Sequence, residues 1–221
     1  MLKQLLSVFL ESRCAFCDRT TSNTLCEYCF EKLSSHQLSR RDRHIRDQNL
    51  AIFAWGKYDG QLKRAIATMK YNHQPEIGDL LGQLLGKLWL DSPWSKIQHP
   101  VSVMPIPLHR SRLKERGFNQ AEVIAKSFCQ LTGYGLNTQG LIRVKQTKAM
   151  FDLKNLDDRA KNLRGAFGIG HNLPKHPVLL VDDIYTTGTT IKESIRILQQ
   201  KKIKVIGVAV VAKAGHKLSN K

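Results

Sequence analysis

Two adjacent carboxylates, Asp182 and Asp183, directly follow a short apolar run, Val178–Val181, in this chain of 221 residues. A loop rich in hydroxyl side chains comes next, and Gly188 within it permits a tight backbone turn. A helix is then expected to begin near Thr190. Because open α/β sheets bind ligands at the carboxyl ends of their strands, we expect the two carboxylates to lie at a ligand site.

The loop after the carboxylates has the composition of a phosphate-binding turn. Backbone N–H groups at a helix N-terminus bind anions, and hydroxyl groups add hydrogen bonds to phosphate oxygens. The predicted phosphate-binding residues are Thr186, Thr187, Gly188, Thr189 and Thr190. Ionised carboxylates beside a phosphate must bind something else, and paired sugar hydroxyls are suitable donors. The segment therefore predicts a site for a ribose 5-phosphate; the alternative is an acidic turn followed by a threonine-rich helix cap.

A second cluster brings four cations within seven residues, shortly after a predicted strand at Val101–Ile106. The four are Arg110, Arg112, Lys114 and Arg116. The planar fork of arginine and the point charge of lysine both suit phosphate oxygens, so this cluster predicts a second anion-binding segment. The alternative is a set of cations on a solvated helix.

Four of the five cysteines form two C-x2-C pairs separated by eight residues, namely Cys14, Cys17, Cys26 and Cys29. Each pair places two thiolates on one tight turn, and two facing turns complete a tetrahedral site for Zn²⁺. A closed shell of four thiolates has no position for water, which predicts a structural ion; contact of this unit with DNA is the weaker alternative. Cys129 lies in a helical pattern and is expected to be a small buried hydrophobe.

Strand and helix patterns alternate after residue 50, which predicts an α/β domain around a mainly parallel sheet. The expected strands are Leu50–Trp55, Val101–Ile106, Val178–Val181 and Val205–Val211. The expected helices are Asp59–Tyr71, Ile77–Leu90, Gln120–Leu131 and Thr190–Gln200. The last strand is almost continuously apolar, as expected for a strand buried on both faces.

Composition and charge narrow the class of protein. The chain is 42% hydrophobic and 24% charged, which excludes collagenous, low-complexity and largely disordered proteins. Its net charge is +17, and residues 101–221 hold 21 basic and 8 acidic side chains. Such an excess favours anionic partners: phosphate, pyrophosphate or nucleic acid. The alternative is a protein that is merely basic.

The sequence also predicts its domain division and location. We expect a zinc-binding unit with a linker over residues 1–47, the basic stretch near residue 40 being the solvated linker, and one larger domain over residues 48–221. No apolar run approaches the roughly 18 residues that a bilayer crossing needs. The apolar patch Leu5–Leu10 is expected to form an amphipathic helix rather than a secretory signal, and the chain to be cytoplasmic.

The segment Val178–Thr190 resembles the signature of type I phosphoribosyltransferases, which bind phosphoribosyl pyrophosphate (PRPP). With the four-cysteine unit and the segment Pro105–Asn119, the chain resembles the ComF family of competence-associated proteins over essentially its whole length. The resemblance implies a type I phosphoribosyltransferase-like sheet flanked by helices, with a small N-terminal zinc-ribbon-like unit. It also implies a flexible lid over Arg143–Phe167, although Met150 stands about where many relatives have glutamine.

The resemblance further assigns roles to the two clusters. Asp182 and Asp183 would contact the ribose hydroxyls and steady the sugar during catalysis, and residues 186–190 would hold the 5-phosphate. The pyrophosphate would bind the cationic cluster, Arg110, Arg112, Lys114 and Arg116. Mg²⁺ would bridge pyrophosphate and ribose oxygens, since it prefers oxygen ligands and needs few from the protein.

Three functions agree with these features. The preferred one is a phosphoribosyltransferase-like component of natural transformation that binds PRPP and single-stranded DNA on the cytoplasmic side, with DNA-uptake or helicase components as partners. The second is a metabolic phosphoribosyltransferase that transfers ribose 5-phosphate to an acceptor the sequence does not name. The third is a zinc-ribbon DNA-binding protein with a vestigial sugar-phosphate pocket.

Overall fold

The computed structural model describes residues 12–97, 99–147 and 162–215. A six-stranded sheet lies at the centre, with strand order β3-β4-β10-β9-β5-β6. Its strands are β3 (His44–Asp47), β4 (Leu50–Lys57), β5 (Ser102–Pro105), β6 (Gly135–Leu136), β9 (Val178–Tyr185) and β10 (Val205–Lys213). All neighbours pair in parallel except β3 and β4, which are antiparallel. The predicted α/β class is therefore confirmed.

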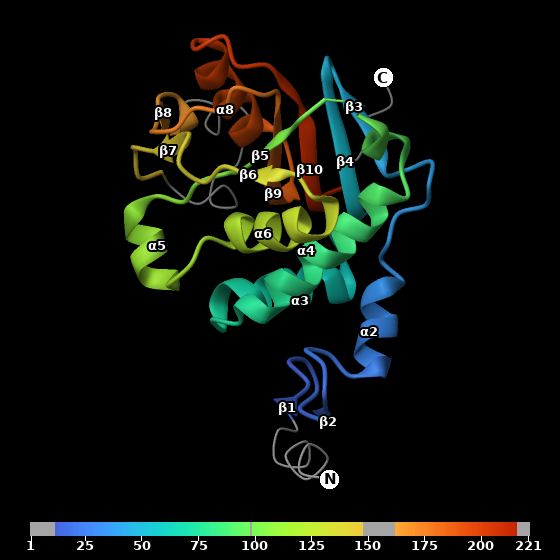
Figure 1. The fold of residues 1–221 in the computed structure, drawn as a ribbon. Coiled ribbons are helices and arrows are strands. Elements are labelled where there is room, and N and C mark those ends of the chain that lie inside the picture. The colour runs from blue at the N-terminus through green and yellow to red at the C-terminus, as the bar shows by residue number, and fades with distance from the viewer. Residues whose placement is uncertain (1–11, 98, 148–161, 216–221) are drawn as a thin grey trace, which may run out of the picture.

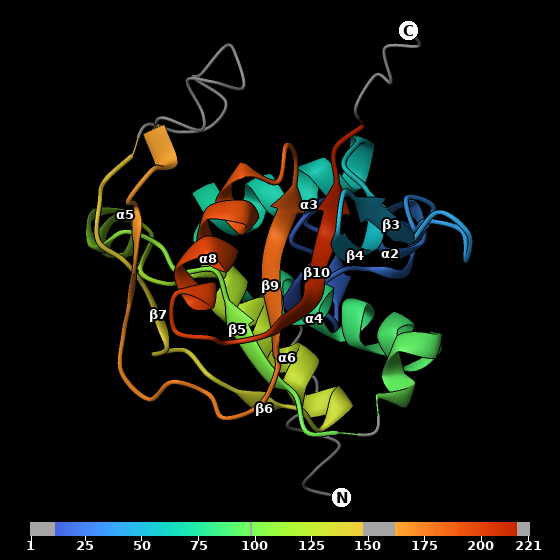
Figure 2. The same cartoon turned by 90° about the horizontal axis from the view of Figure 1, so that it is seen from above.

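Helices cover both faces of this sheet (Figure 1). One face carries α3 (Gly60–Tyr71), α4 (Pro75–Leu90) and α6 (Gln120–Thr132), and the other carries α8 (Thr189–Gln199). Viewed from above, β9 and β10 run through the middle of the molecule (Figure 2). Alternate residues of β9 enter different cores: Leu179 and Val181 pack toward α3, α4 and α6, whereas Val178 and Leu180 pack toward α8. Asp183 continues the first series.

The predicted helices agree closely with the observed ones. Asp59 caps α3, as expected, because its carboxylate accepts a hydrogen bond from the Gly60 N–H at 2.8 Å. Gly133 ends α6 in a left-handed conformation with φ of 74°, as the Thr132-Gly133 signal predicts. Within the described ranges, each helix falls short of the length and apolarity that crossing a bilayer requires.

Two expectations about strands are wrong. The strand expected to end at Val181 continues to Tyr185, because parallel pairing with β10 extends to the Tyr185–Lys213 pair. Strand pairing thus outweighs the low strand propensity of the two aspartates. Residues 44–47, expected as linker, form β3, in which Ile45 pairs with Ile52 of β4. The sheet therefore begins before the predicted domain boundary.

The N-terminal unit consists of a short hairpin and one helix. The hairpin pairs β1 (Ser12–Arg13) with β2 (Thr20–Thr21), and α2 (Glu27–Ser34) follows. Phe16 joins the same core as α3, and Arg64 of α3 donates a hydrogen bond to the Phe16 carbonyl at 2.5 Å. The remaining elements are η1 (Pro93–Lys96), α5 (Arg110–Arg116), β7 (Leu141–Arg143) and β8 (Phe167–Ile169). The helix expected at Leu5–Leu10 lies outside the described residues, as does most of the expected lid, Met150 included.

Candidate active site and metal centre

A cavity of about 330 Å³ opens at the carboxyl ends of β5 and β9, where a parallel sheet binds ligands. Two carboxylates, four cations, two tyrosines and two threonines line it: Asp182, Asp183, Lys70, Arg112, Arg116, Arg143, Tyr58, Tyr71, Thr186 and Thr190. The cations outnumber the carboxylates, so the cavity is suited to an anion that also carries hydroxyl groups.

Asp183 is the most enclosed of the charged groups, with 6% of its side chain exposed. It forms an ion pair with Lys70 of α3, and Gln120 of α6 donates a hydrogen bond to its Oδ1 at 3.4 Å. Burial raises the pKa of Asp183, but the Lys70 ammonium and these hydrogen bonds outweigh burial and lower that pKa. Asp183 is therefore ionised and paired at neutral pH.

Asp182 has a different environment although it is the next residue. Its Oδ1 accepts a hydrogen bond from the Asp183 backbone N–H at 2.9 Å. Burial, and then the adjacent charge of Asp183, raise the pKa of Asp182 well above its usual value. The two carboxylates thus have pKa values on opposite sides of the usual one, a pattern common at functional sites.

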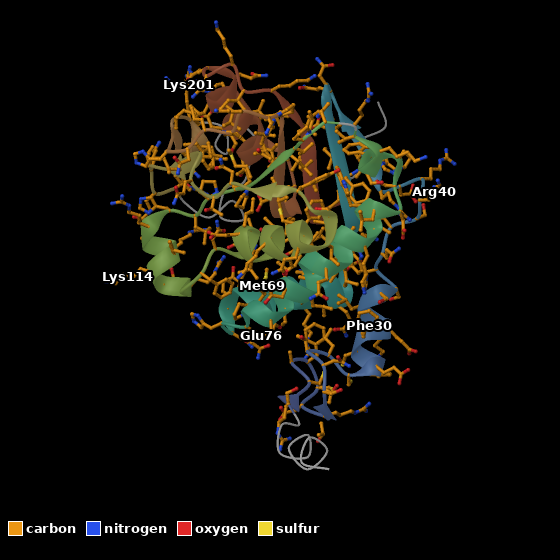
Figure 3. The ribbon with its side chains drawn as sticks, viewed as in Figure 1. Phe30, Arg40, Met69, Glu76, Lys114 and Lys201 are labelled. Carbon is orange, nitrogen blue, oxygen red and sulfur yellow. The ribbon has the colours of Figure 1, made fainter. Side chains whose placement is uncertain are left out.

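The cationic cluster forms a helix, α5, rather than the loop implied by family resemblance. The segment is rich in good helix formers, and Gly117 ends it with φ of 81°. Residues four apart share one helix face, so Arg112 and Arg116 both reach the cavity. Arg110 lines a neighbouring cavity beside Ile142, and Lys114 lies on α5 at the edge of the molecule (Figure 3). The structure thus brings together two of the four predicted cations.

A chain of polar contacts joins α5 to the carboxylates. Arg116 Nη1 donates to Gln120 Oε1 at 2.5 Å, and Gln120 in turn donates to Asp183. Burial lowers the pKa of Arg116, while the charge of Asp183 raises it. The Arg116 guanidinium also lies 6.0 Å from the ring centroid of Tyr71. These contacts hold a partly buried cation at the cavity wall.

The threonine-rich turn closes the cavity on the side of α8. Thr186 and Thr190 line the cavity, while Thr187 and Thr189 share a hydrogen bond between their hydroxyls at 2.8 Å. Gly188 precedes α8 with φ of 71°, and a Cβ there would lie 2.2 Å from the Tyr185 hydroxyl oxygen. Glycine is therefore required at this position, both for the backbone angle and for space.

The four predicted metal ligands come together in the N-terminal unit. Their Sγ atoms all lie within 4.8 Å of one another, and the Cys17 and Cys26 atoms are 3.5 Å apart. A tetrahedral Zn²⁺ with Zn–S bonds of about 2.3 Å requires sulfur atoms about 3.8 Å apart. The cluster of Cys14, Cys17, Cys26 and Cys29 could therefore hold a zinc ion.

Two thiols of the cluster differ in acidity. Burial raises the pKa of Cys14, but hydrogen bonds from the backbone of Cys26, Phe16 and Cys17 outweigh it and lower the pKa to about 6. Burial, and then the neighbouring thiols, raise the pKa of Cys29 to about 12. A bound cation would favour the thiolate form of all four.

The chain is similar in sequence to a phosphoribosyl transferase domain family and to two competence proteins. The phosphoribosyl transferase domain family model matches residues 154–221. Competence protein F of Haemophilus influenzae is 26% identical over 93% of this chain and 99% of its own length. Competence protein ComFC of Bacillus subtilis is 27% identical over 80% of this chain and 72% of its own length. These matches, together with the four-cysteine cluster, support a ComF-family protein.

A further relative and a solved structure are also similar to this chain. DNA utilization protein YhgH of Escherichia coli K12 is 25% identical over 84% of the chain and 83% of its own length. Among solved structures, a phosphoribosyltransferase from Corynebacterium diphtheriae aligns with 18% identity and a TM-score of 0.40, covering 86% of each chain. That structural likeness is too distant to bear on function.

Some residues that line or support the cavity at the ends of β5 and β9 were not predicted from the sequence. Lys70 and Gln120 were not among the predicted site residues, yet both contact Asp183. Arg143 was assigned to the lid, but it ends β7 and lines the cavity. The local signal at each position is that of an ordinary polar residue at the end of an element, so only the tertiary arrangement reveals these contacts.

Proposed function

We propose that this ComF-family protein binds PRPP in the cavity at the ends of β5 and β9. The observation that carries the proposal is the combination of carboxylates, cations and a hydroxyl-rich helix start around one cavity. The turn before α8 would hold the 5-phosphate, and Asp182 would accept hydrogen bonds from the ribose hydroxyls. Arg112 and Arg116 would bind the pyrophosphate.

Mg²⁺ would accompany PRPP, held chiefly by the oxygens of PRPP itself. Among the described residues that line the cavity, the carboxylates are Asp182 and Asp183, and Asp183 already has protein partners on both oxygens. The protein's own contribution to loss of pyrophosphate would be electrostatic, since arginines around the leaving group stabilise its developing charge. A metabolic transferase acting on an acceptor is the alternative function of the same cavity.

The role that we propose is in DNA uptake. Relatives named competence proteins and DNA utilization proteins support it, as does the net charge of +17. Single-stranded DNA would follow the basic surface on the cytoplasmic side, in contact with DNA-uptake or helicase components. The four-cysteine unit would hold a structural Zn²⁺ while packing against the core of the phosphoribosyltransferase-like domain.

Two cations of α5 should differ in their importance for PRPP. Arg112→Ala is expected to weaken PRPP binding by about 10- to 100-fold, because a charge-assisted hydrogen bond to the ligand is lost. Lys114→Ala, on the same helix but away from the cavity, should change the affinity by less than about 3-fold. Isothermal titration of both variants checks this; equal losses would contradict binding of pyrophosphate by one face of α5.

Binding of single-stranded DNA should depend steeply on salt. If about four phosphates are neutralised, the affinity should fall roughly 50-fold between 50 and 200 mM salt. Fluorescence anisotropy with a labelled oligonucleotide across this range measures the slope. Negligible affinity at 50 mM salt, together with release of pyrophosphate from PRPP in the presence of an acceptor, would instead favour the metabolic transferase.

A further inference from the structure

The Asp183 carboxylate is occupied by the protein itself. Lys70 pairs with Oδ2, and Gln120 donates to Oδ1. Both partners are enclosed, since only 17% of the Lys70 side chain and 6% of the Asp183 side chain are exposed. Because so little of the Asp183 side chain is exposed, ribose hydroxyls or a divalent cation would have to displace these partners to reach it. The two adjacent carboxylates are therefore not equivalent.

The position of Lys70 is fixed by the fold. It lies in the last turn of α3, one turn after Ile66, which is buried and lines the same cavity. The Lys70 side chain lines the cavity together with Arg112, Arg116 and Asp182. An ammonium group has three donors, so pairing with Asp183 leaves two for an anionic ligand. A positive charge is thereby built into the cavity next to the carboxylate pair.

We propose that the Lys70 ammonium is a permanent positive charge of this site and binds the pyrophosphate end of PRPP. The inference rests on the proposed binding of PRPP. Asp183 then acts as a positioning residue that holds Lys70, while Asp182 alone receives the ribose hydroxyls. Lys70 supplies at this point the charge that a metal ion coordinated by Asp183 would otherwise supply. PRPP binding therefore depends only weakly on Mg²⁺, which strengthens binding through the oxygens of PRPP.

The experiment compares PRPP affinity in Mg²⁺ and in EDTA by isothermal titration. The wild-type affinity should fall by less than about 10-fold in EDTA. Lys70→Gln should weaken binding by about 10-fold with Mg²⁺ and by about 100-fold or more in EDTA, because both cations are then absent. Lys70→Arg, which keeps the charge, should restore most of the affinity in EDTA. Lys63→Gln is the matched control, since Lys63 is an exposed lysine of α3 that does not line the cavity.

The outcomes separate this inference from the proposed function. Loss of all wild-type binding in EDTA, with binding retained in Mg²⁺, would overturn the role of Lys70 but leave the PRPP site intact. A Lys70→Gln variant equally weakened in both conditions would also overturn it, because a purely structural ion pair has no reason to interact with Mg²⁺. Absence of wild-type binding in Mg²⁺ would refute the PRPP site itself. The wild-type comparison requires no substitution and holds even if Lys70→Gln fails to fold.

Discussion

Replacing both carboxylates of β9, as Asp182→Asn with Asp183→Asn, is expected to lower the affinity for PRPP by at least about 100-fold, or about 2.7 kcal/mol. The substitution removes the acceptors of the ribose hydroxyls and releases Lys70 from its partner. Asparagine has nearly the volume of aspartate, so the packing of β9 between two layers of helices is retained. Isothermal titration with PRPP and Mg²⁺ measures the loss.

The single substitution Asp182→Asn separates loss of ribose binding from loss of stability. It breaks no ion pair among the described residues, whereas Asp183→Asn leaves a largely enclosed lysine without its carboxylate, which can destabilise a protein by about 3–5 kcal/mol. Thermal unfolding of each variant distinguishes loss of binding from loss of the fold. Unchanged PRPP affinity in a folded Asp182→Asn variant would refute the assignment of this carboxylate to the ribose.

Replacing Cys26 with serine is expected to remove zinc and to loosen the N-terminal unit. Cys26 contributes one of four sulfur atoms that lie within 4.8 Å of one another, and it directly precedes α2. Without the metal, the short hairpin and the single helix retain few stabilising contacts of their own. We expect the zinc content to fall from about one ion per chain to near zero, and the melting temperature to fall by about 5–10 °C.

Cys129→Ala is the matched control for the loss of zinc. Burial raises the pKa of this thiol to about 12, and Cys129 lies on α6, outside the four-cysteine cluster. The variant should keep its full zinc content, measured by atomic emission on the purified protein. Full zinc in Cys26→Ser would contradict the four-thiolate site, and equal losses in both variants would indicate a general effect of unfolding.

Local patterns were enough to predict most of the architecture. The alternation of apolar strands with amphipathic helices, and caps such as Asp59 and Gly133, located α3, α4, α6 and α8 to within about two residues, but not α2 or α5. Spacing alone predicted the four-cysteine cluster, since two C-x2-C turns can meet around one ion. These features are encoded within a few residues of sequence.

Features that depend on distant segments were not predictable in the same way. The extension of β9 through Asp183 depends on pairing with β10, and β3 depends on antiparallel pairing with β4. The contact between Lys70 and Asp183 joins residues more than a hundred positions apart. Of the cations of α5, Arg112 and Arg116 line the cavity, and a cluster of charges in the sequence cannot reveal which of its members do so.

Titration of the purified wild-type chain with PRPP in the presence of Mg²⁺ tests the central claim most directly. A phosphorylated pentose bound at the ends of β5 and β9 should give saturable heat with about one site per chain, and a raised melting temperature that increases with ligand concentration. Ribose 5-phosphate, which lacks the pyrophosphate that Arg112 and Arg116 would bind, should bind more weakly. Absence of both heat and thermal shift with PRPP would contradict the account.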